Sequence, residues 1–389
     1  MALPNVTIVV NRSGLGLVDY TDDGIMGLIV SGSAVANKLE LSKAYAIYGL
    51  TDAEALGIEE AGVNATAHKQ IKEFYDEAGN GVKIWILVSD KTLMSLNATG
   101  TTNNLKTLIE AAKGEISVVG ICRGKTQSEV VVDGLNEDVW STMAAVQILA
   151  EEYRGLIMPF SAVIDGIGFS GDASSTLDLT TKTQHRCSVI LASTGTDKVA
   201  SASVGQFLGR EASIPVQRKP SRIKDGSLTN EKAYLTDGAS IDGRVGALNT
   251  LHDRGYIVFR TLVGKSGFFY SGDPSATAAT DDLNTIARNR VMDKVLKIAY
   301  NTYAEELDDD VPVTESGTLQ PAVCGYLQEK IDKQVKGNMV DEISKFSSYV
   351  NPNQNILSGA PVEIQLSIVP KGYLNPIKVT IGFSNPYSS

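Results

Sequence analysis

Two short stretches of the sequence hold residue types that could do chemistry. Residues 166–171 read GIGFSG, which matches the G-x-G-x-x-G pattern that places a nucleotide pyrophosphate at a helix N-terminus. The residues that follow, DASSTLDLTT, open a helix poorly, so an ordinary glycine-rich turn is the favoured interpretation. Ser170, Asp172 and His185 have the residue types of a nucleophilic triad, but GFSGD lacks the last glycine of the G-x-S-x-G elbow.

Metal chemistry is not indicated either. The three histidines, His68, His185 and His252, are far apart along the chain, and so are the three cysteines, Cys122, Cys187 and Cys324. His185 and Cys187 could give two metal ligands, but two more are lacking. That spacing gives no metal-ligand cluster and is typical of buried thiols in a reducing compartment. The acidic run EELDDDV at residues 305–311 lacks the alternating carboxylates and the glycine of a calcium loop, so a solvated loop is favoured. We therefore predict no catalytic, cofactor or metal site, and a protein that is not an enzyme.

Composition limits the partners. The chain has 389 residues, 43% of them apolar and 21% charged, with a net charge of −10, which is an ordinary globular balance for two or three domains. The sequence has no dense basic cluster, so a nucleic-acid partner is disfavoured. No apolar run reaches the length of a membrane span, and the N-terminal stretch lacks the basic n-region of a signal peptide. We expect no membrane insertion and no secretion by a signal peptide.

Residues 20–225 predict an α/β domain. Amphipathic helices are expected at 64–78, 105–113 and 137–154, and a poorer helix at 177–183. Near-continuous apolar runs alternate with them at 24–32, 82–88, 116–121, 157–164 and 187–192. Such alternation is typical of a mainly parallel sheet covered by helices on both faces.

The polar, proline-containing stretch at 210–232 looks like a domain boundary, and residues 226–389 predict an α+β domain. The segments 255–263 and 266–272 suggest a hairpin-like pair. A long helix is expected at 281–307, with Asp281 and Asp282 in its first turn, and a second helix at 321–335. Two strands, 362–368 and 377–383, end the chain.

Both ends of the chain have strand character. Residues 377–383 place Ile377, Val379, Ile381 and Phe383 on one face. Residues 1–19 form an N-terminal arm whose strand, 5–10, contains Asn5, Val6, Ile8 and Val10. A strand at a free end exposes unpaired backbone groups, which invites another chain to pair with it. The alternative is that both strands pair within their own chain.

Several segments together resemble the contractile tail sheath proteins of phages and related injection systems. They are RSGLGLVDYTDDGIMGLIVSG (12–32), AHKQIKEFYDEAGNGVKIWILV (67–88), SVGQFLGREASIPVQRKPSR (203–222), LNTLHDRGYIVFRTLVGKSGFFYSG (248–272) and LNTIARNRVMDKVLKIAYNTY (283–303). The chain departs from the family in being compact, with few inserted outer domains. The resemblance implies an outer α/β domain with a mainly parallel sheet, and an inner α+β domain whose terminal strands extend to neighbouring subunits.

The resemblance also implies a function. The chain would be a structural subunit that polymerises helically around an inner tube by exchange of the terminal strands, and that contracts to drive the tube. Its partners would be other copies of itself, the inner tail tube protein, and the baseplate and tail terminator proteins, with no cofactor. It would be made in the bacterial cytoplasm and lie in a virion tail or an injection particle; phage, bacteriocin-like and type VI-like systems all remain open. Two alternatives are a nucleotide- or small-molecule-binding α/β enzyme that uses residues 166–171, and another virion structural protein.

Three lysines mark a candidate tube-facing surface. Lys330, Lys333 and Lys336 recur every three residues and so share one side of the predicted helix 321–335 and its end. In an acidic chain this positive ridge could dock on an acidic tube, where complementary charge sets register. A solvated helix face is the alternative.

Overall fold

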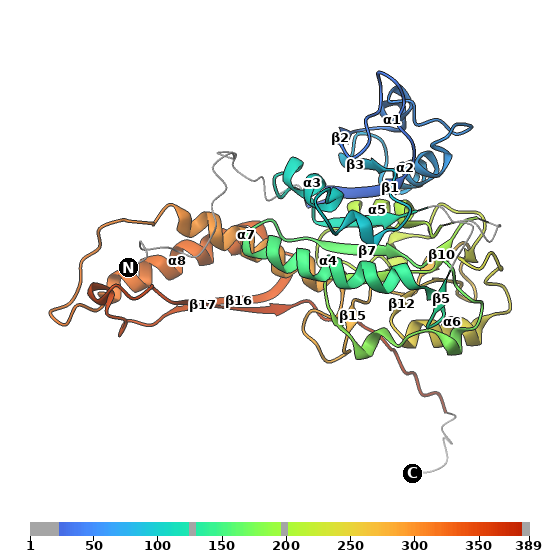
Figure 1. Cartoon of the computed structure of the whole chain (residues 1–389). Coiled ribbons are helices and arrows are strands. Elements are labelled where there is room, and N and C mark those ends of the chain that lie inside the picture. Colours follow the sequence, from blue (N-terminus) through green and yellow to red (C-terminus); the bar gives the residue numbers. More distant parts are fainter. Residues whose placement is uncertain (1–22, 124–129, 196–200, 383–389) are drawn as a thin grey trace, which may run out of the picture.

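The computed structural model describes residues 23–123, 130–195 and 201–382. The predicted strand 5–10 and Phe383 lie outside them. The described chain forms an α/β body and an elongated C-terminal lobe (Figure 1).

The centre of the body is a seven-stranded sheet in the order β12-β9-β7-β4-β1-β3-β2. Its strands are β1 (Met26–Ser31), β2 (Ala44–Ile47), β3 (Ile84–Ser89), β4 (Val118–Cys122), β7 (Ser161–Asp165), β9 (Cys187–Ile190) and β12 (Tyr256–Ile257). All pairings are parallel except that of β2 with β3 at one edge. The predicted mainly parallel sheet is therefore confirmed.

Helices cover both faces of this sheet, which is why its strands are continuously apolar. The helices of the body are α1 (Leu50–Ala55), α2 (Ala65–Ala78), α3 (Asn104–Ala111), α4 (Glu137–Gly155), α5 (Val204–Ala212) and α6 (Val245–Asp253). The face covered by α3 includes Gly27, which lies against Leu108, and the face covered by α5 includes Gly120, which lies against Val204. Strand β4 is buried along its whole length, as expected for a strand packed on both sides.

Helices α2 and α5 approach each other closely at Gly205. A Cβ atom at this position would lie 1.9 Å from the carbonyl oxygen of Gln70, so only glycine fits. The side chain of Gln70 then fixes the start of α5: its Oε1 accepts from the Gly205 amide (2.6 Å), and its Nε2 donates to the Ala202 carbonyl (2.8 Å). This contact holds α5 on the sheet.

The C-terminal lobe has its own core. It consists of α7 (Ile286–Ala304), α8 (Pro321–Asn338) and the antiparallel pair β16 (Ile343–Val350) and β17 (Ile364–Pro370). One face of the pair packs on the helices through Phe346, Leu366 and Ile368. Residues on the opposite face of the pair, such as Tyr349 and Gln365, are exposed.

Short elements complete the chain. The remaining two-stranded pairs are β5 (Val131–Val132) with β6 (Leu135–Asn136), β8 (Thr183–Gln184) with β15 (Ala276–Thr277), β10 (Ala192–Ser193) with β11 (Tyr234–Leu235), and β13 (Phe259–Arg260) with β14 (Phe269–Tyr270). The last pair confirms the predicted hairpin-like segments. Single 3-10 turns are η1 (Ser95–Asn97), η2 (Ala173–Ser175), η3 (Leu179–Thr181), η4 (Ile223–Asp225) and η5 (Ile356–Ser358), and η3 replaces the poorer helix expected at 177–183.

Two predicted boundaries are wrong. Strand β12 joins the sheet and the core of the body continues to Ile286, so the division falls at the start of α7 rather than at residue 225. The long helix begins after Thr285, whose side chain accepts a hydrogen bond from the Arg288 amide (3.3 Å). Asp281 therefore lies in the preceding turn, where its Oδ1 accepts from the Leu283 amide (2.8 Å).

Candidate functional site

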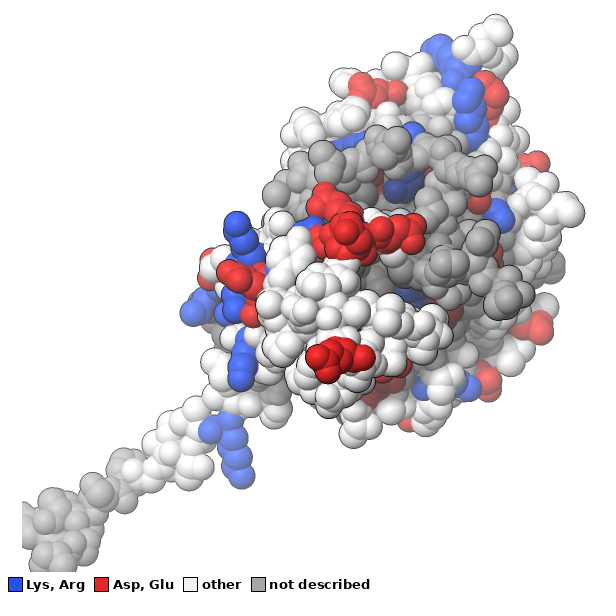
Figure 2. All heavy atoms as spheres, turned by 90° about the vertical axis from the view of Figure 1, so that its left-hand side faces the viewer, with Lys and Arg blue, Asp and Glu red and all other residues white. Residues whose placement is uncertain are grey.

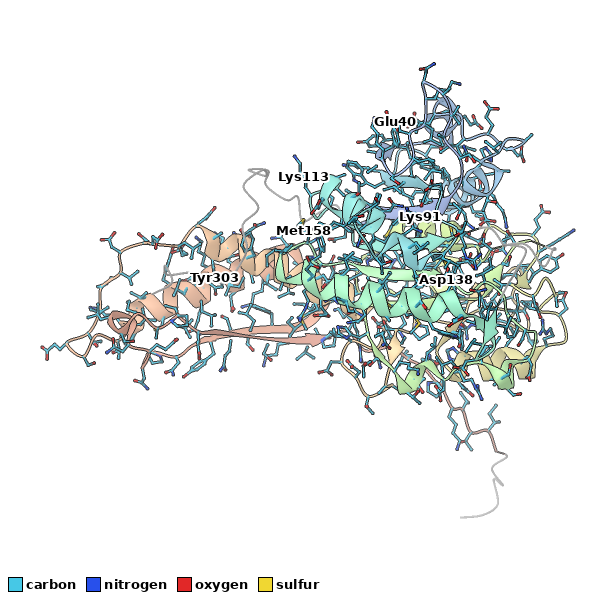
Figure 3. The ribbon with its side chains drawn as sticks, in the orientation of Figure 1. Glu40, Lys91, Lys113, Asp138, Met158 and Tyr303 are labelled. Carbon is cyan, nitrogen blue, oxygen red and sulfur yellow. The ribbon has the colours of Figure 1, made fainter. Side chains whose placement is uncertain are left out.

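An enzyme with this sheet would bind its ligand at the carboxyl ends of the strands, near the point where the strand order reverses. Here β1 lies between β3 and β4. Arg123, just after β4, pairs with Asp138 at the start of α4 (Nε to Oδ2, 3.2 Å), and both side chains are 1% exposed. Asp138 also accepts from the amides of Met94 and Ser95 (2.5 and 3.0 Å). Asp138 therefore joins the start of η1 to α4, in the part of the body where Figure 3 labels it.

Asp165 ends β7 at the same edge and is completely buried. Its Oδ1 accepts from the Ala202 amide (2.8 Å). Burial raises the pKa of the Asp165 carboxyl to about 7, and the Ala202 amide and the Arg123 and Lys69 charges oppose that rise. Burial likewise raises the pKa of the neighbouring Cys122 thiol well above its usual value, so this thiol is not a ready nucleophile.

Asp165→Asn is expected to reduce the pH dependence of stability. Because the folded-state pKa is raised from 3.8 to about 7, the folded chain holds this proton more tightly than the unfolded chain. The stability that Asp165 contributes is full below about pH 4 and is lost as the pH rises through about 7. Asparagine keeps the acceptor for the Ala202 amide and has no charge to bury. Melting temperatures measured from about pH 4 to about pH 8 should fall more steeply for the native chain; parallel curves would contradict this.

The motif at residues 166–171 is a turn. The Gly166 amide donates to the Ile190 carbonyl (2.9 Å), and the Thr236 hydroxyl donates to the Gly166 carbonyl (2.7 Å). Gly168 has φ 76°, which suits glycine, and only the three-residue turn η2 follows. The structure therefore provides no helix N-terminus for a pyrophosphate here, in agreement with the favoured interpretation.

The triad residues serve separate structural contacts. Asp172 accepts from the Ser174 amide (2.8 Å), Ser170 contacts the Ser175 hydroxyl (3.2 Å), and His185 pairs with Glu151 (3.0 Å). No group of three histidine, cysteine or acidic residues among the described residues could hold a metal ion.

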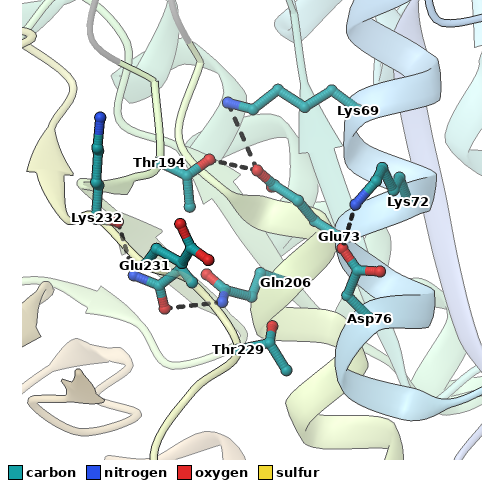
Figure 4. Close-up of a pocket in the computed structure, with 10 residues that line it drawn as sticks. Lys69, Lys72, Glu73, Asp76, Thr194, Gln206, Thr229, Glu231 and Lys232 are labelled. Atoms are coloured by element: carbon teal, nitrogen blue, oxygen red, sulfur yellow. Dashed lines mark hydrogen bonds and ion pairs between the residues drawn. The ribbon is translucent and has the colours of Figure 1, made fainter. Parts of the chain in front are cut away.

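A polar pocket of about 370 Å³ lies between α2, α5 and the loop at 229–232 (Figure 4). Its charged groups are largely paired with one another: Lys72 contacts Asp76 (2.7 Å), and Lys69 contacts Glu73 (3.6 Å), which also accepts from Thr194. A surface so neutralised offers no strong charge for a ligand.

The C-terminal segment, residues 371–382, has backbone outside any described strand and exposed apolar side chains. After β17, described residues 371–382 form no strand and pair with none of the described strands. The predicted apolar face is exposed to solvent: Ile377 is 71%, Val379 73% and Ile381 91% exposed. Residues 377–382 therefore do not pair with a strand of their own described chain, which was the alternative prediction. Asn5, Val6, Ile8, Val10 and Phe383 lie outside the described residues.

Strands β16 and β17 offer the edges to which such a segment could add. They form a sheet of two strands in the described chain, so each strand has one edge without a described partner. Strand β16 was missed by the sequence prediction. Its buried residues Ile343, Phe346 and Val350 are spaced three and four apart, which resembles a helix, because a bulge interrupts the pairing near Lys345.

The three lysines of α8 differ in their surroundings. Lys330 pairs with Glu305 (3.2 Å) and Glu306, and Lys336 pairs with Asp332 (2.8 Å). Lys333 is exposed. The positive ridge is thus partly neutralised within the chain, while acidic side chains are prominent on the far end of the lobe (Figure 2), where residues 308–310 are exposed aspartates.

This fold, with an open α/β body and a lobe of two helices and two strands, is the fold of contractile sheath proteins. The sheath of the anti-feeding prophage (AFP) in the contracted state matches with a TM-score of 0.64 at 13% identity, over 99% of this chain and 99% of that chain. The contracted PVC sheath of an extracellular contractile injection system matches with a TM-score of 0.64 at 12% identity, over 99% of this chain and 98% of that chain. The sheath tail protein of Desulfitobacterium hafniense matches with a TM-score of 0.52 at 8% identity, over 94% of this chain and 100% of that chain. The predicted resemblance to tail sheath proteins is confirmed.

The chain belongs to the DUF2586 family. The model of its N-terminal domain matches residues 3–273, and that of its C-terminal domain matches residues 282–388. The gap between the two matches falls just before α7, where the body ends. The search of curated proteins gave no match. Within the described ranges, none of the helices is both long and apolar enough to cross a bilayer.

Proposed function

We propose that this chain is a structural subunit of a contractile sheath that polymerises helically around an inner tube and shortens to drive it. The observation that carries the proposal is the match in fold to sheath proteins over nearly the whole of both chains. Arg123 and Asp138 at the carboxyl edge of the sheet support a structural role, because they are buried and paired with each other, and the buried Asp165 accepts from the Ala202 amide.

Assembly is by strand exchange. The segment 377–383, through Ile377, Val379, Ile381 and Phe383, adds to a neighbour beside its strand β17, and Asn5, Val6, Ile8 and Val10 of the N-terminal arm add to another neighbour. Nine residues from Val369 to Ile377 reach at most about 30 Å, enough for an adjacent subunit. Each subunit donates and receives, so the contacts are heterologous and build an open helical array. The lobe forms the inner connected layer, and the body lies outside it.

The partners follow from this role. They are other copies of the chain, the inner tail tube protein, and the baseplate and tail terminator proteins, in a virion tail or an injection particle assembled in the bacterial cytoplasm.

Sedimentation and electron microscopy of the purified chain test the proposal. A sheath subunit should pellet as rods or rings, alone or with its tube protein. A chain that stays a small oligomer under both conditions would contradict the proposal.

Reversal of the lysine ridge is expected to weaken assembly around tubes at low salt. Changing Lys330, Lys333 and Lys336 to Glu replaces attraction for an acidic tube by repulsion. The matched control changes three exposed lysines elsewhere, Lys38, Lys224 and Lys265, to Glu, with the same change in net charge. The single change Lys333→Glu separates docking from loss of the ion pairs of Lys330 and Lys336. Normal yields of tube-filled sheaths from the first variant would rule out this docking surface.

A further inference from the structure

The C-terminal segment is held at one residue, Tyr373, before it leaves the molecule. The hydroxyl of Tyr373 donates to the carbonyl of Gln217 (2.6 Å). The Nζ of Lys219 lies 4.6 Å from the centre of the ring, a cation–π distance. Burial raises the pKa of the Tyr373 hydroxyl, which therefore remains a donor at neutral pH. The next residue, Leu374, is 89% exposed.

Lys219 connects this contact to the start of α7. Its Nζ lies 3.4 Å from Oδ1 of Asp273, which is completely buried. The other oxygen of Asp273 accepts from the Ala287 amide (3.0 Å), and its carbonyl accepts from the Ile286 amide (3.0 Å). Tyr373 is thus joined through two residues to the first turn of α7.

The same helix holds Asp23, the first described residue and the one that follows the predicted N-terminal arm. Arg290 donates to the carbonyl of Asp23 (3.0 Å), and Lys294 pairs with its carboxylate (2.6 Å). Arg290 is completely buried and also pairs with the buried Glu211 (2.6 Å), and Lys294 pairs with Glu342 next to β16 (2.9 Å). The root of each terminal segment is therefore fixed to α7, one at the first turn and one at Arg290 and Lys294.

We propose that Tyr373 anchors the C-terminal segment, and that α7 holds the roots of both terminal segments at a fixed spacing. The inference rests on the proposed function, in which both segments bind neighbouring subunits. Ile286 and Lys294 are eight residues apart, or about 12 Å along a helix, and helix geometry does not stretch. From the anchor, the tether is the four residues from Leu374 to Ile377, which span at most about 14 Å, less than the about 30 Å of the unanchored chain from Val369. The exchanged strand therefore leaves from a constant point and can reach only a directly adjacent subunit. Tyr373 is a positioning residue for the exchanged strand.

Spin-label distance measurements on the unassembled chain test this anchor. Labels are placed at Leu374→Cys and at Ile148→Cys, an exposed position on α4 that is 72% accessible. The three native cysteines are buried and should not react. With the anchor, the label sits on the first free residue after Tyr373. Without the anchor, the same label sits on the fourth free residue after Pro370, where β17 ends. Since spread grows with the square root of free residues, Tyr373→Ala should widen the distance distribution about twofold.

Three further variants make the test specific. Tyr373→Phe loses the hydrogen bond to Gln217 but keeps the ring beside Lys219. Lys219→Met loses the cation but keeps the Tyr373 hydroxyl. Each should therefore widen the distance distribution less than Tyr373→Ala does. Tyr48→Ala, at a tyrosine of the body that is 51% exposed, should leave it unchanged. A distribution as narrow in Tyr373→Ala as in the native chain would overturn the anchor.

Trypsin gives a second measurement that needs no labels. Lys371 lies between β17 and the anchor, and Lys378 lies beyond it. Cleavage after Lys371 should be slow in the native chain and should approach the rate after Lys378 in Tyr373→Ala; equal rates in the native chain would contradict the anchor. Both measurements use single subunits, so they remain informative if the chain fails to form rods, which would contradict only the proposed function.

Discussion

Deletion of residues 377–389 is expected to leave a folded subunit that no longer forms rods. The described part of this segment contributes nothing to either core: Ile377, Val379 and Ile381 are all more than two-thirds exposed. The free energy of unfolding should therefore change by no more than about 0.5 kcal/mol, as for ordinary surface changes. Thermal unfolding measures the first effect, and sedimentation with electron microscopy measures the second. Rods of normal yield from the shortened chain would refute strand exchange at this end.

A single substitution separates the backbone ladder from the side-chain contacts. Val379→Pro removes one backbone donor in the middle of the exchanged strand, so it should prevent assembly almost as strongly as the deletion. Val379→Thr keeps the donor and the β-branched shape, and should still assemble. If Val379→Pro forms normal rods, the segment does not join a neighbour's sheet through its backbone. Neither variant should alter the melting temperature of the single subunit.

The central sheet could be predicted because its signal is local. A parallel strand covered on both faces is a short apolar run, and β3, with Ile84, Ile86, Leu87 and Val88 all buried, is one such run. Strand β2 is an antiparallel edge strand with one fully buried residue, Ile47, and gave no such signal. Strand β12 has two residues, too few for any periodicity.

The domain boundary was misplaced because a polar segment was taken for a linker. In the structure this segment lies on the body and is bound to it: the Thr229 amide donates to Glu77 (2.6 Å), and the Leu228 amide donates to the Phe268 carbonyl (2.9 Å). Polarity describes a surface position but does not show whether the chain leaves a domain there. The start of α7 was misplaced for a related reason, since an aspartate suits the turn before a helix as well as the first turn itself.

The candidate assembly segment was visible in the sequence, while its anchor was not. The alternation of Ile377, Val379 and Ile381 lies within five residues and needs no knowledge of the fold. The hydrogen bond from Tyr373 to Gln217 joins residues 156 apart in the chain, and Lys294 reaches Asp23 across 271. Pairs at such separations follow from the packing of α7 on the body, which sequence spacing alone does not determine.

Arg186→Met is expected to cost roughly 3–5 kcal/mol of the free energy of unfolding, the usual result of breaking a buried ion pair. Nη1 of Arg186, the residue before β9, donates to both carboxylate oxygens of Asp293 on α7 (2.8 and 2.7 Å). Arg186 is completely buried and Asp293 is 8% exposed, so the substitution leaves a carboxylate in a site that water barely reaches. The matched control is Lys72→Met, whose pair with Asp76 is about half exposed and should be worth at most about 1 kcal/mol. Urea unfolding curves measure both changes.

The double variant Arg186→Met with Asp293→Leu tells whether the lost stability comes from the stranded charge. With both partners apolar no charge remains to be buried, so the double variant should be more stable than Arg186→Met alone. The double variant could instead lose as much free energy of unfolding as Arg186→Met and Asp293→Leu lose together. The pair would then stabilise the fold through its own hydrogen bonds, and the explanation by an unpaired buried charge would be wrong. The distinction bears on assembly because Arg186 and Asp293 join the body to the helix that holds both terminal segments. A subunit whose α7 is loosened from the body, yet keeps Ile377, Val379 and Ile381 intact, should still bind its neighbours, while the roots of its terminal segments are held less firmly.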